Sequence, residues 1–438
     1  MKKSNYNIFL NDGRNSLLAF NTLTGALARM TLREYRTFLT YIQNKKEYKS
    51  KLFEDLKKGG FIVEDNFQEL SRLRVQNRII RYQTSIIGLT IAPTLFCNFS
   101  CKYSIQDKKP TYMKETVAET LIKYLANRLK DGVRELHVTW YGGEPLLPRA
   151  YNIIKRLSQK FGDLCKKHNA SYSFGLVTNG SLLTKEIVTE LKKNRCTWVQ
   201  ITLDGPPEVH NQRRPFRNGK GSFDNIINNL KKIKHLLPVR IRINVDRQNY
   251  QTCLPLLNIL EKEGLKRYLS VYFAPVEAYT QICQDVNHFC FVRKEFSKIQ
   301  LNLYQQALDQ GFNIIPFPVS IPTACGAECL SSLLIEPDGY IQKCWNTIGM
   351  PDEAVGHLID KELNKKLEPN LIKWLDWDVF KEKKCLRCKI LPICMGSCLH
   401  KKLGPMGKSL ECPTWRYNLK DMLKLYYKGW KISNENKK

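Results

Sequence analysis

Apolar runs and amphipathic stretches alternate six times between residue 85 and about residue 317, and this alternation constrains the fold most strongly. Repeated strand–helix units favour a parallel sheet covered by helices, because parallel neighbours need a long crossover between them. The expected strands are residues 85–92, 135–141, 172–178, 198–203, 239–246 and 268–275, and the expected helices are residues 113–130, 149–168, 184–194, 223–236, 252–264 and 288–310. We therefore predict an α/β chain with a partial (β/α)6 TIM-type barrel over residues 85–317.

The loop that follows the first expected strand, residues 91–106, contains Cys97 and Cys101, and then Tyr103 and Ser104. A thiol at position 104 would complete a C-x3-C-x2-C loop, a spacing that can hold three corners of a [4Fe–4S] cube and leave the fourth iron open. A serine oxygen is a harder and far less acidic ligand than a thiolate, so Ser104 suits iron–sulfur chemistry poorly. The loop is expected at the carboxyl end of a strand, where α/β enzymes carry their active sites.

Polar and glycine-rich motifs follow the next three expected strands. Residues 141–145 read Tyr-Gly-Gly-Glu-Pro, residues 178–180 read Thr-Asn-Gly, and residues 203–206 read Leu-Asp-Gly-Pro before a run that contains Arg214. Paired glycines let a ligand approach the backbone, and a neighbouring carboxylate can accept hydrogen bonds from an ammonium group. Each motif alone is typical of a turn, but their occurrence at successive strand ends predicts one shared site.

Eight of the fifteen cysteines lie near the C-terminus in a spacing that is typical of metal ligands. They are Cys325, Cys329, Cys344, Cys385, Cys388, Cys394, Cys398 and Cys412. C-x2-C pairs are also ordinary zinc-ribbon spacing, so zinc is one interpretation. Two sets of four thiols in a chain that also carries the C-x3-C loop favour iron–sulfur clusters. The other five, Cys165, Cys196, Cys253, Cys283 and Cys290, are expected to be small buried apolar residues.

These motifs together resemble the radical S-adenosylmethionine (SAM) enzymes with a C-terminal SPASM extension, and the resemblance covers essentially the whole chain. It implies that Cys97, Cys101 and the residue at 104 hold the cluster that binds SAM and cleaves it to a 5′-deoxyadenosyl radical. Tyr103 matches the aromatic position of the loop. The resemblance implies SAM contacts for the strand-end residues Gly142, Gly143, Glu144, Pro145, Thr178, Asn179 and Arg214.

The same resemblance implies two auxiliary [4Fe–4S] clusters in residues 318–425. Their interleaved ligand sets would be Cys325, Cys329, Cys344 and Cys398 for the first, and Cys385, Cys388, Cys394 and Cys412 for the second. Sulfatase-maturing members of the family have an aspartate directly after the cysteine that matches Cys344. This chain has Trp345 there, so sulfatase maturation is not expected.

Residues 1–84 are expected to form a separate unit with strands at 7–11, 16–21 and 61–63 and helices at 32–43, 48–58 and 67–82. This order suggests a winged-helix-like module, which in peptide-modifying relatives grips the leader of a precursor peptide by strand addition. An extension that only packs on the barrel is the alternative. Residues 426–438 form a basic tail.

The formal charge of +29 favours acidic partners, although a highly charged, solvated surface explains it equally well. No short basic–aromatic pattern indicates nucleic-acid binding. The N-terminus lacks the apolar core of a signal peptide, and no apolar run is long enough to span a membrane, so a cytoplasmic location is expected.

The sequence thus predicts a maturase that installs a thioether, C–C or ether crosslink in a ribosomally made precursor peptide, with a flavodoxin or ferredoxin as reductant. Ser104 is expected to weaken or abolish turnover. A non-catalytic scaffold that retains the auxiliary clusters and binds a peptide or nucleic acid is the alternative. A different SPASM chemistry, such as oxidation of a protein side chain, is a third interpretation.

Overall fold

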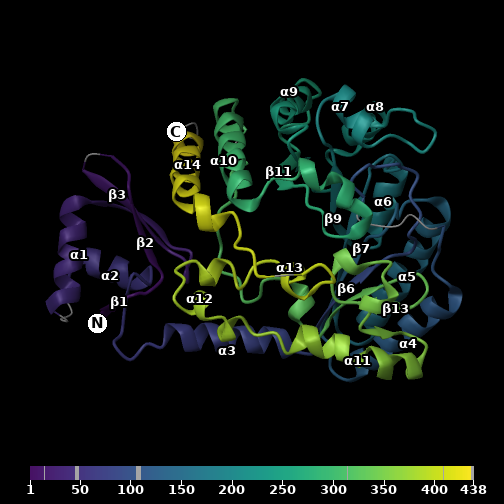
Figure 1. The fold of residues 1–438 in the computed structure, drawn as a ribbon, viewed down its shortest axis with the longest axis horizontal. Helices are drawn as coiled ribbons and strands as arrows, with labels where there is room; N and C mark the ends of the chain where they lie inside the picture. Colours follow the sequence, from purple (N-terminus) through teal and green to yellow (C-terminus); the bar gives the residue numbers. More distant parts are fainter. Residues whose placement is uncertain (14, 45–48, 105–109, 313, 408, 436–438) are drawn as a thin grey trace.

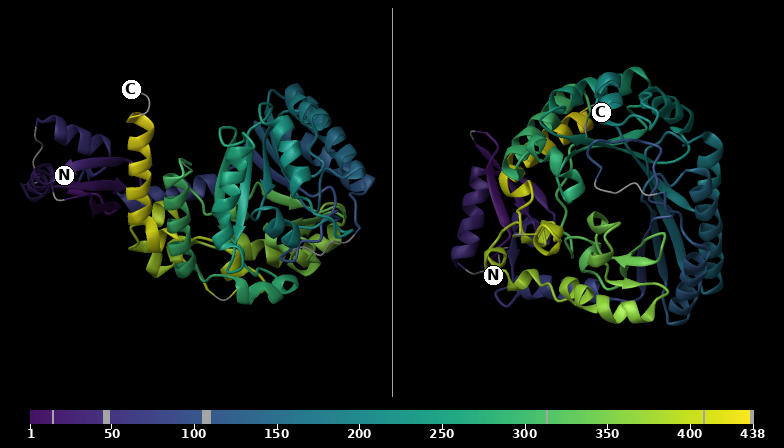
Figure 2. Two further views of the ribbon diagram at one scale, coloured as in Figure 1. Left: turned by 90° about the horizontal axis from the view of Figure 1, so that it is seen from above. Right: turned by 45° about the vertical axis from the view of Figure 1, so that its right-hand side comes forward.

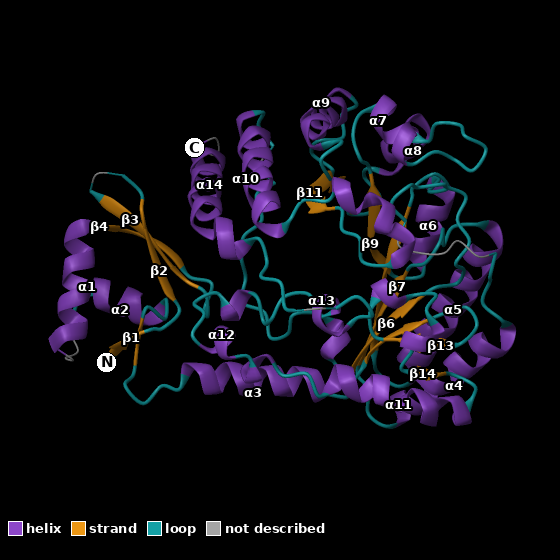
Figure 3. Ribbon diagram, viewed as in Figure 1, coloured by secondary structure: helices purple, strands orange, loops and turns teal. Residues whose placement is uncertain are grey.

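The computed structural model describes residues 1–438 except 14, 45–48, 105–109, 313, 408 and 436–438. Its centre is a nine-stranded sheet with the order β11-β10-β9-β8-β7-β6-β12-β13-β14 (Figures 1 and 3). The six predicted strands are present as β6 (Ile86–Ile91), β7 (Glu135–Trp140), β8 (Ser171–Thr178), β9 (Cys196–Thr202), β10 (Val239–Val245) and β11 (Leu269–Pro275). The mixed α/β class is therefore confirmed.

The C-terminal part of the chain adds three strands to this sheet that the alternation did not predict. β12 (Ser332–Ile335) pairs parallel to β6, and β13 (Tyr340–Gln342) and β14 (Gly356–His357) continue the sheet in antiparallel fashion. Among the described residues β11 and β14 are the two ends of the sheet, so its strands do not close on each other. Residues distant in sequence thus build one continuous sheet.

Helices cover the convex side of the curved sheet (Figure 2). Those between the strands are α4 (Glu115–Lys130), α5 (Pro148–Lys167), α6 (Lys185–Lys193), α7 (Pro207–Arg213), α8 (Phe223–Ile233), α9 (Cys253–Lys262) and α10 (Arg293–Asp309). On β10 the side chains of Val239, Ile241 and Ile243 are buried against these helices, whereas Arg240 and Arg242 alternate with them and are not buried. The period of two in the sequence therefore separates an apolar helix-covered face from a polar concave face.

The N-terminal unit has a three-stranded antiparallel sheet of β2 (Asn7–Asn11), β3 (Ser16–Asn21) and β4 (Leu27–Thr31). α1 (Leu32–Asn44) and α2 (Lys51–Lys58) pack on it, and β1 (Lys2–Lys3) pairs with β5 (Ile62–Val63). The predicted helices and strands are present, and β1 and β4 are strands that the sequence analysis did not predict. Part of the predicted helix at 48–58 lies outside the described residues.

α3 (Glu69–Tyr82) leaves this unit and lies along the C-terminal segment (Figure 1). Asn77 donates to the Pro322 carbonyl at 2.8 Å, and the buried Arg81 pairs with the buried Glu328 at 3.5 Å. Apolar residues of β2 and β3, Ile8 and Phe20 among them, also pack against the C-terminal helix. The ends of the chain are thus held together by a shared core.

The C-terminal segment contains α11 (Lys361–Leu375), α12 (Lys383–Leu386), α13 (His400–Leu403) and α14 (Trp415–Glu435). α14 packs against α10, where Asn418 donates to the Ser297 carbonyl at 2.9 Å. No helix in the described ranges combines the length and apolarity needed to cross a lipid bilayer.

Candidate functional site

A cavity of about 360 Å³ lies at the carboxyl ends of the parallel strands. Cys97, Cys101 and Ser104 all line it, so the three positions of the predicted cluster loop face one space. Also lining it are Tyr103, Gly142, Gly143, Thr178, Asn179 and Arg214, all predicted from sequence. Glu144 and Pro145 are not among the lining residues.

The cysteine loop is fixed by the segment that follows α7. Ser100 N–H donates to the Pro215 carbonyl at 2.9 Å, and Arg217 Nε donates to the Cys97 carbonyl at 2.8 Å. The Phe99 ring meets the Phe216 ring edge-on at a centroid distance of 4.9 Å. The position of both thiols therefore depends on the loop between the fourth strand and its helix.

The paired glycines are required by the backbone of the cysteine loop. Gly142 has φ of +114°, and a Cβ there would lie 2.5 Å from the Thr94 carbonyl oxygen. A Cβ on Gly143 would lie 2.0 Å from the Phe96 carbonyl oxygen. The sequence suggested that these glycines admit a ligand; in the structure they also admit the loop that carries Cys97.

Glu144 is completely buried and holds the end of β8 in place. Its carboxylate accepts hydrogen bonds from Thr178 Oγ1 at 2.7 Å, from Asn179 N at 2.8 Å and from Leu146 N at 2.9 Å. Burial raises the pKa of Glu144, although these hydrogen bonds oppose the rise. In this arrangement the carboxylate positions Thr178 and Asn179, which do line the cavity.

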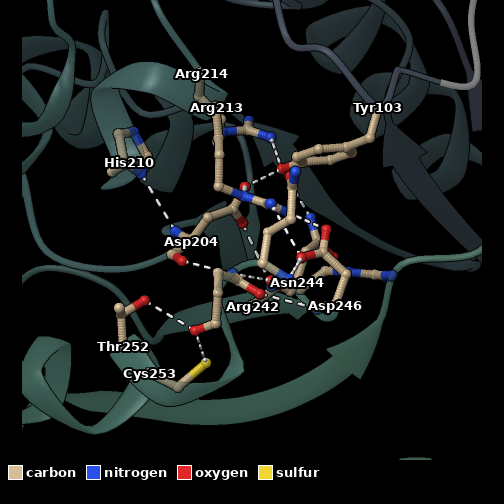
Figure 4. Close-up of polar contacts among 12 residues, drawn as sticks. Tyr103, Asp204, His210, Arg213, Arg214, Arg242, Asn244, Asp246, Thr252 and Cys253 are labelled. Carbon is tan, nitrogen blue, oxygen red and sulfur yellow. Dashed lines mark hydrogen bonds and ion pairs between the residues drawn. The ribbon is translucent and has the colours of Figure 1, made fainter. Parts of the chain in front are cut away.

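A polar network behind the loop includes residues that the sequence motifs did not single out (Figure 4). The Tyr103 hydroxyl donates a very short hydrogen bond to Asp204, and Arg214 Nη1 donates to that hydroxyl at 2.7 Å. Arg213 pairs with Asp204 at 3.4 Å and with Asp246 at 2.8 Å. Tyr103 and Arg214, predicted as cofactor contacts, are thereby tied to buried charges at the ends of β9 and β10.

One wall of the cavity is aromatic and links the sheet to the C-terminal segment. Trp345 stacks on Tyr141 with ring centroids 4.4 Å apart, and its indole Nε1 donates to Thr90 Oγ1 at 3.0 Å. Further lining residues that sequence reasoning missed are Gln200, Thr202, Arg242, Asn244, Glu277, Tyr279 and Asn346. For Gln200 and Thr202 on β9 and for Arg242 and Asn244 on β10, the alternation along each strand already indicated that the side chain lies on the concave face.

The eight C-terminal cysteines are all free thiols. Electrostatic interactions connect the thiols in two groups. Cys325 interacts with Cys329 and Cys398, and Cys344 interacts with Cys325 and Cys398. In the second group, Cys394 interacts with Cys385, Cys388 and Cys412. The sequence analysis predicted these two sets as ligand groups, and that assignment stays a prediction.

The donor chemistry of both groups suits a soft metal centre, since every member is a thiol. Four thiolates at about 2.3 Å from one zinc ion would lie within about 4 Å of one another. Within the described part of the chain, no three Cys, His, Asp or Glu side chains are gathered for a single metal ion.

Of the five remaining cysteines, Cys165, Cys196, Cys253 and Cys283 are buried, and Cys290 is partly exposed. Burial raises the pKa of Cys165 to about 11 and that of Cys253 to about 12, so both are protonated at neutral pH. The burial of the first four is consistent with their predicted role as small apolar residues, whereas Cys290 was expected to be buried and is partly exposed.

Fold and site together define an α/β protein with a thiol-lined cavity at the carboxyl ends of its parallel strands. Residues 91–258 match the model of the Radical SAM superfamily. The cysteine-type anaerobic sulfatase-maturating enzyme of Clostridium novyi (strain NT) is 23% identical over 70% of this chain and 86% of its own length. The radical SAM cyclopropyl synthase TigE of Paramaledivibacter caminithermalis is 24% identical over 89% of this chain and 88% of its own length.

Solved structures share the fold. Native anSMEcpe with bound AdoMet has a TM-score of 0.58 at 19% identity and covers 80% of this chain and 99% of its own. Streptococcus suis SuiB bound to precursor peptide SuiA has a TM-score of 0.54 at 15% identity and covers 93% of this chain and 97% of its own. The resemblance to SuiB thus extends over nearly the whole chain.

Proposed function

We propose that the chain is a radical SAM/SPASM maturase that installs a thioether, C–C or ether crosslink in a ribosomally made precursor peptide. The observation that carries the proposal is the shared cavity of Cys97, Cys101 and position 104 with the strand-end residues. The names of two similar proteins also support a peptide maturase, since TigE is a cyclopropyl synthase and the structure of SuiB contains a precursor peptide.

Cys97, Cys101 and the residue at 104 would hold the first [4Fe–4S] cluster, next to SAM. Gly142, Gly143, Thr178, Asn179 and Arg214 would contact SAM, with Glu144 and Pro145 supporting them from behind. When bound, this cluster and SAM supply a 5′-deoxyadenosyl radical that removes a hydrogen atom from the substrate. Arg214 presents a guanidinium to the cavity and suits the SAM carboxylate, because Tyr103 fixes its orientation.

The two C-terminal thiol groups would hold one auxiliary [4Fe–4S] cluster each. With four thiolates apiece, neither would have an open iron, which suits electron transfer or a structural role. Cys344 directly precedes Trp345 in the cavity wall, so the first auxiliary site would adjoin the proposed substrate space. This placement suits a centre that accepts the surplus electron after the crosslink closes.

Ser104 would leave one iron of the first cluster without its thiolate, so we infer that turnover by this chain is low. The test compares the chain with Ser104→Cys by anaerobic incubation with SAM and dithionite. We expect 5′-deoxyadenosine from Ser104→Cys and little or none from the parent chain. Absence of 5′-deoxyadenosine from an iron-loaded Ser104→Cys protein would refute the proposal.

The precursor peptide is the proposed macromolecular partner, and a flavodoxin or ferredoxin is the proposed reductant. β2 and β4 are the edges of the N-terminal sheet and could each accept a peptide strand from the leader. Deleting residues 1–84 would remove α3 and Arg81 from the shared core, so point changes on an edge strand test leader docking more cleanly than a deletion. A leader that binds equally well after both edges are blocked would refute that role.

A second candidate function is a non-catalytic peptide- or nucleic-acid-binding scaffold, and Ser104 is the observation that favours it. A scaffold would keep the auxiliary clusters and produce no 5′-deoxyadenosine even after Ser104→Cys. The same incubation therefore separates the two functions.

A further inference from the structure

Arg242 on β10 points its guanidinium into the cavity in a fixed orientation. Its Nε donates to Asn244 Oδ1 at 2.7 Å, and Asn244 Nδ2 donates in turn to the Tyr103 hydroxyl at 3.1 Å. This chain of hydrogen bonds uses the Nε of the guanidinium, and among the described residues no hydrogen bond uses its two Nη groups, so a ligand in the cavity that Arg242 lines can accept from them.

The described residues provide no counter-ion for Arg242. Asp204 and Asp246, the carboxylates nearest in the polar network, are both paired with Arg213. The ion pairs of the described residues include none to Arg242 itself. The polar network therefore contains three guanidinium groups, those of Arg213, Arg214 and Arg242, but only the two carboxylates of Asp204 and Asp246.

Glu277, the carboxylate that lines the cavity, is also occupied. It forms ion pairs with Arg293 and with Lys401, the latter at 3.1 Å, and its side chain is only 7% exposed. Glu277 is therefore already paired with two other cations.

Two further donors line the cavity beside Arg242. Thr202 is its register neighbour on β9, and Gln200 lies two residues earlier on that strand. The Tyr272 hydroxyl donates to Gln200 Oε1 at 2.9 Å, which leaves the Gln200 amide NH₂ as a donor. A forked guanidinium flanked by a hydroxyl and an amide matches the two oxygens of a carboxylate.

We propose that Arg242, Gln200 and Thr202 form a subsite that binds a carboxylate of the substrate peptide. The peptide nature of this ligand rests on the proposed function, and Arg214 remains the guanidinium assigned to SAM. The carboxylate comes from an acidic side chain or from the C-terminus of the peptide. The subsite would fix which residue of the peptide lies near the reacting atoms.

The test is residue-resolved protection from phenylglyoxal, which modifies arginine guanidinium groups, in the anaerobically reconstituted protein with SAM present. Three peptides serve as probes: Ac-Ala-Ala-Glu-Ala-Ala-NH₂, Ac-Ala-Ala-Gln-Ala-Ala-OH and Ac-Ala-Ala-Gln-Ala-Ala-NH₂. They carry a side-chain carboxylate, a terminal carboxylate and no carboxylate, respectively. Peptide mass spectrometry then reports the modification rate at each arginine.

We expect at least one carboxylate peptide to slow modification of Arg242 by about tenfold at about ten times its Kd, and the neutral peptide to have no such effect. Protection by only one carboxylate peptide identifies the source of the group. Arg240 is the internal control, because it lies on the same face of β10 but outside the cavity. Equal modification of Arg242 with all three peptides, or its protection by SAM alone, would overturn the proposal.

Arg242→Gln and Arg242→Lys give a second measurement, with Arg240→Gln as the matched charge control. Binding of the protecting peptide should be lost in Arg242→Gln, partly retained in Arg242→Lys and unchanged in Arg240→Gln. This readout is independent of SAM cleavage. If the peptide does not bind through Arg242, the 5′-deoxyadenosine test of the proposed function is unaffected. If that test fails, the result for peptide binding at Arg242 still stands.

Discussion

Trp345 stacks on Tyr141 at a centroid distance of 4.4 Å, with the ring planes 29° apart, and so joins the C-terminal segment to the end of β7. Tyr141 directly precedes the paired glycines, and Trp345 directly follows Cys344. One aromatic contact thus connects the predicted SAM side of the cavity with a predicted auxiliary-cluster ligand.

Replacing Trp345 by alanine should lower the free energy of unfolding by more than about 1 kcal/mol, the usual contribution of an aromatic pair beyond its buried area, because the buried ring area and the hydrogen bond to Thr90 are lost with the stack. Trp345→Phe keeps a ring over Tyr141 and should retain most of that energy. Chemical denaturation, with near-ultraviolet circular dichroism as the probe, measures both variants. Equal losses in the two variants would show that the stack contributes nothing.

Ser104→Cys should raise the iron content after anaerobic reconstitution from about eight to about twelve per chain, because a cubane cluster contains four irons. Ser100→Cys is the matched control, since it adds a thiol to the same loop at an exposed position that does not line the cavity. The control should stay near eight irons. Zinc in place of iron, or equal iron in both variants, would contradict the assignment of position 104.

The two C-terminal thiol groups should lose metal independently. Cys344→Ala and Cys394→Ala should each lower the iron content by about four per chain, and the double variant by about eight. Cys253→Ala, which removes a buried thiol outside both groups, should leave the iron content unchanged. Iron and acid-labile sulfide analysis checks this, and loss of all iron from either single variant would show that the groups are not separate.

Arg213→Met should destabilise the protein by about 3–5 kcal/mol, because it leaves Asp204 and Asp246 buried without their shared counter-ion. Arg247→Met removes an exposed arginine that pairs with Glu295 at the surface, and it should change stability little. Urea denaturation at neutral pH compares the two. A similar small effect of both substitutions would mean that solvent reaches the Asp204–Arg213–Asp246 group.

His210 should make stability fall as the pH drops below about 6.5. Burial, and then the neighbouring Arg214 and Arg213, hold the pKa of His210 well below its usual value. The unfolded chain therefore binds a proton in this range that the folded chain does not, and acid favours unfolding. His210→Gln should flatten the dependence of the unfolding free energy on pH between about 7 and 5, and an unchanged slope would contradict this.

The order of strands and helices from β6 to α10 followed from the sequence because its periodicities are local. β10 is an example, since Val239, Ile241 and Ile243 mark the buried face directly. β4 was missed because Met30 is its only buried residue, so its apolar pattern is too short to stand out in the sequence. β12 was not assigned to the parallel sheet because its partner β6 lies far away in the sequence.

The residues of the candidate site also fall into those that could be predicted from the sequence and those that could not. Cys97, Cys101 and the glycine-rich turns are recognisable because their spacing is local. The alternation on β10 places Arg242 on the concave face but does not show that it lines the cavity, and Trp345 reaches the cavity through long-range packing that its sequence neighbourhood does not indicate. The reason why residue 142 must be glycine could also not be predicted from the sequence, because a side chain there would clash with the carbonyl of Thr94.

The pairing of β12 with β6 has a consequence for synthesis of the chain. The strands from β6 to β11 leave the ribosome in the order in which they pair, but the other edge of β6 must wait for residues 332–335. At translation rates of about 5–20 residues per second, that edge stays uncovered for on the order of ten to fifty seconds. During this interval β6 offers unpaired backbone groups to other nascent chains. Yield in a cell should therefore respond to elongation speed and to chaperones that shield strand edges.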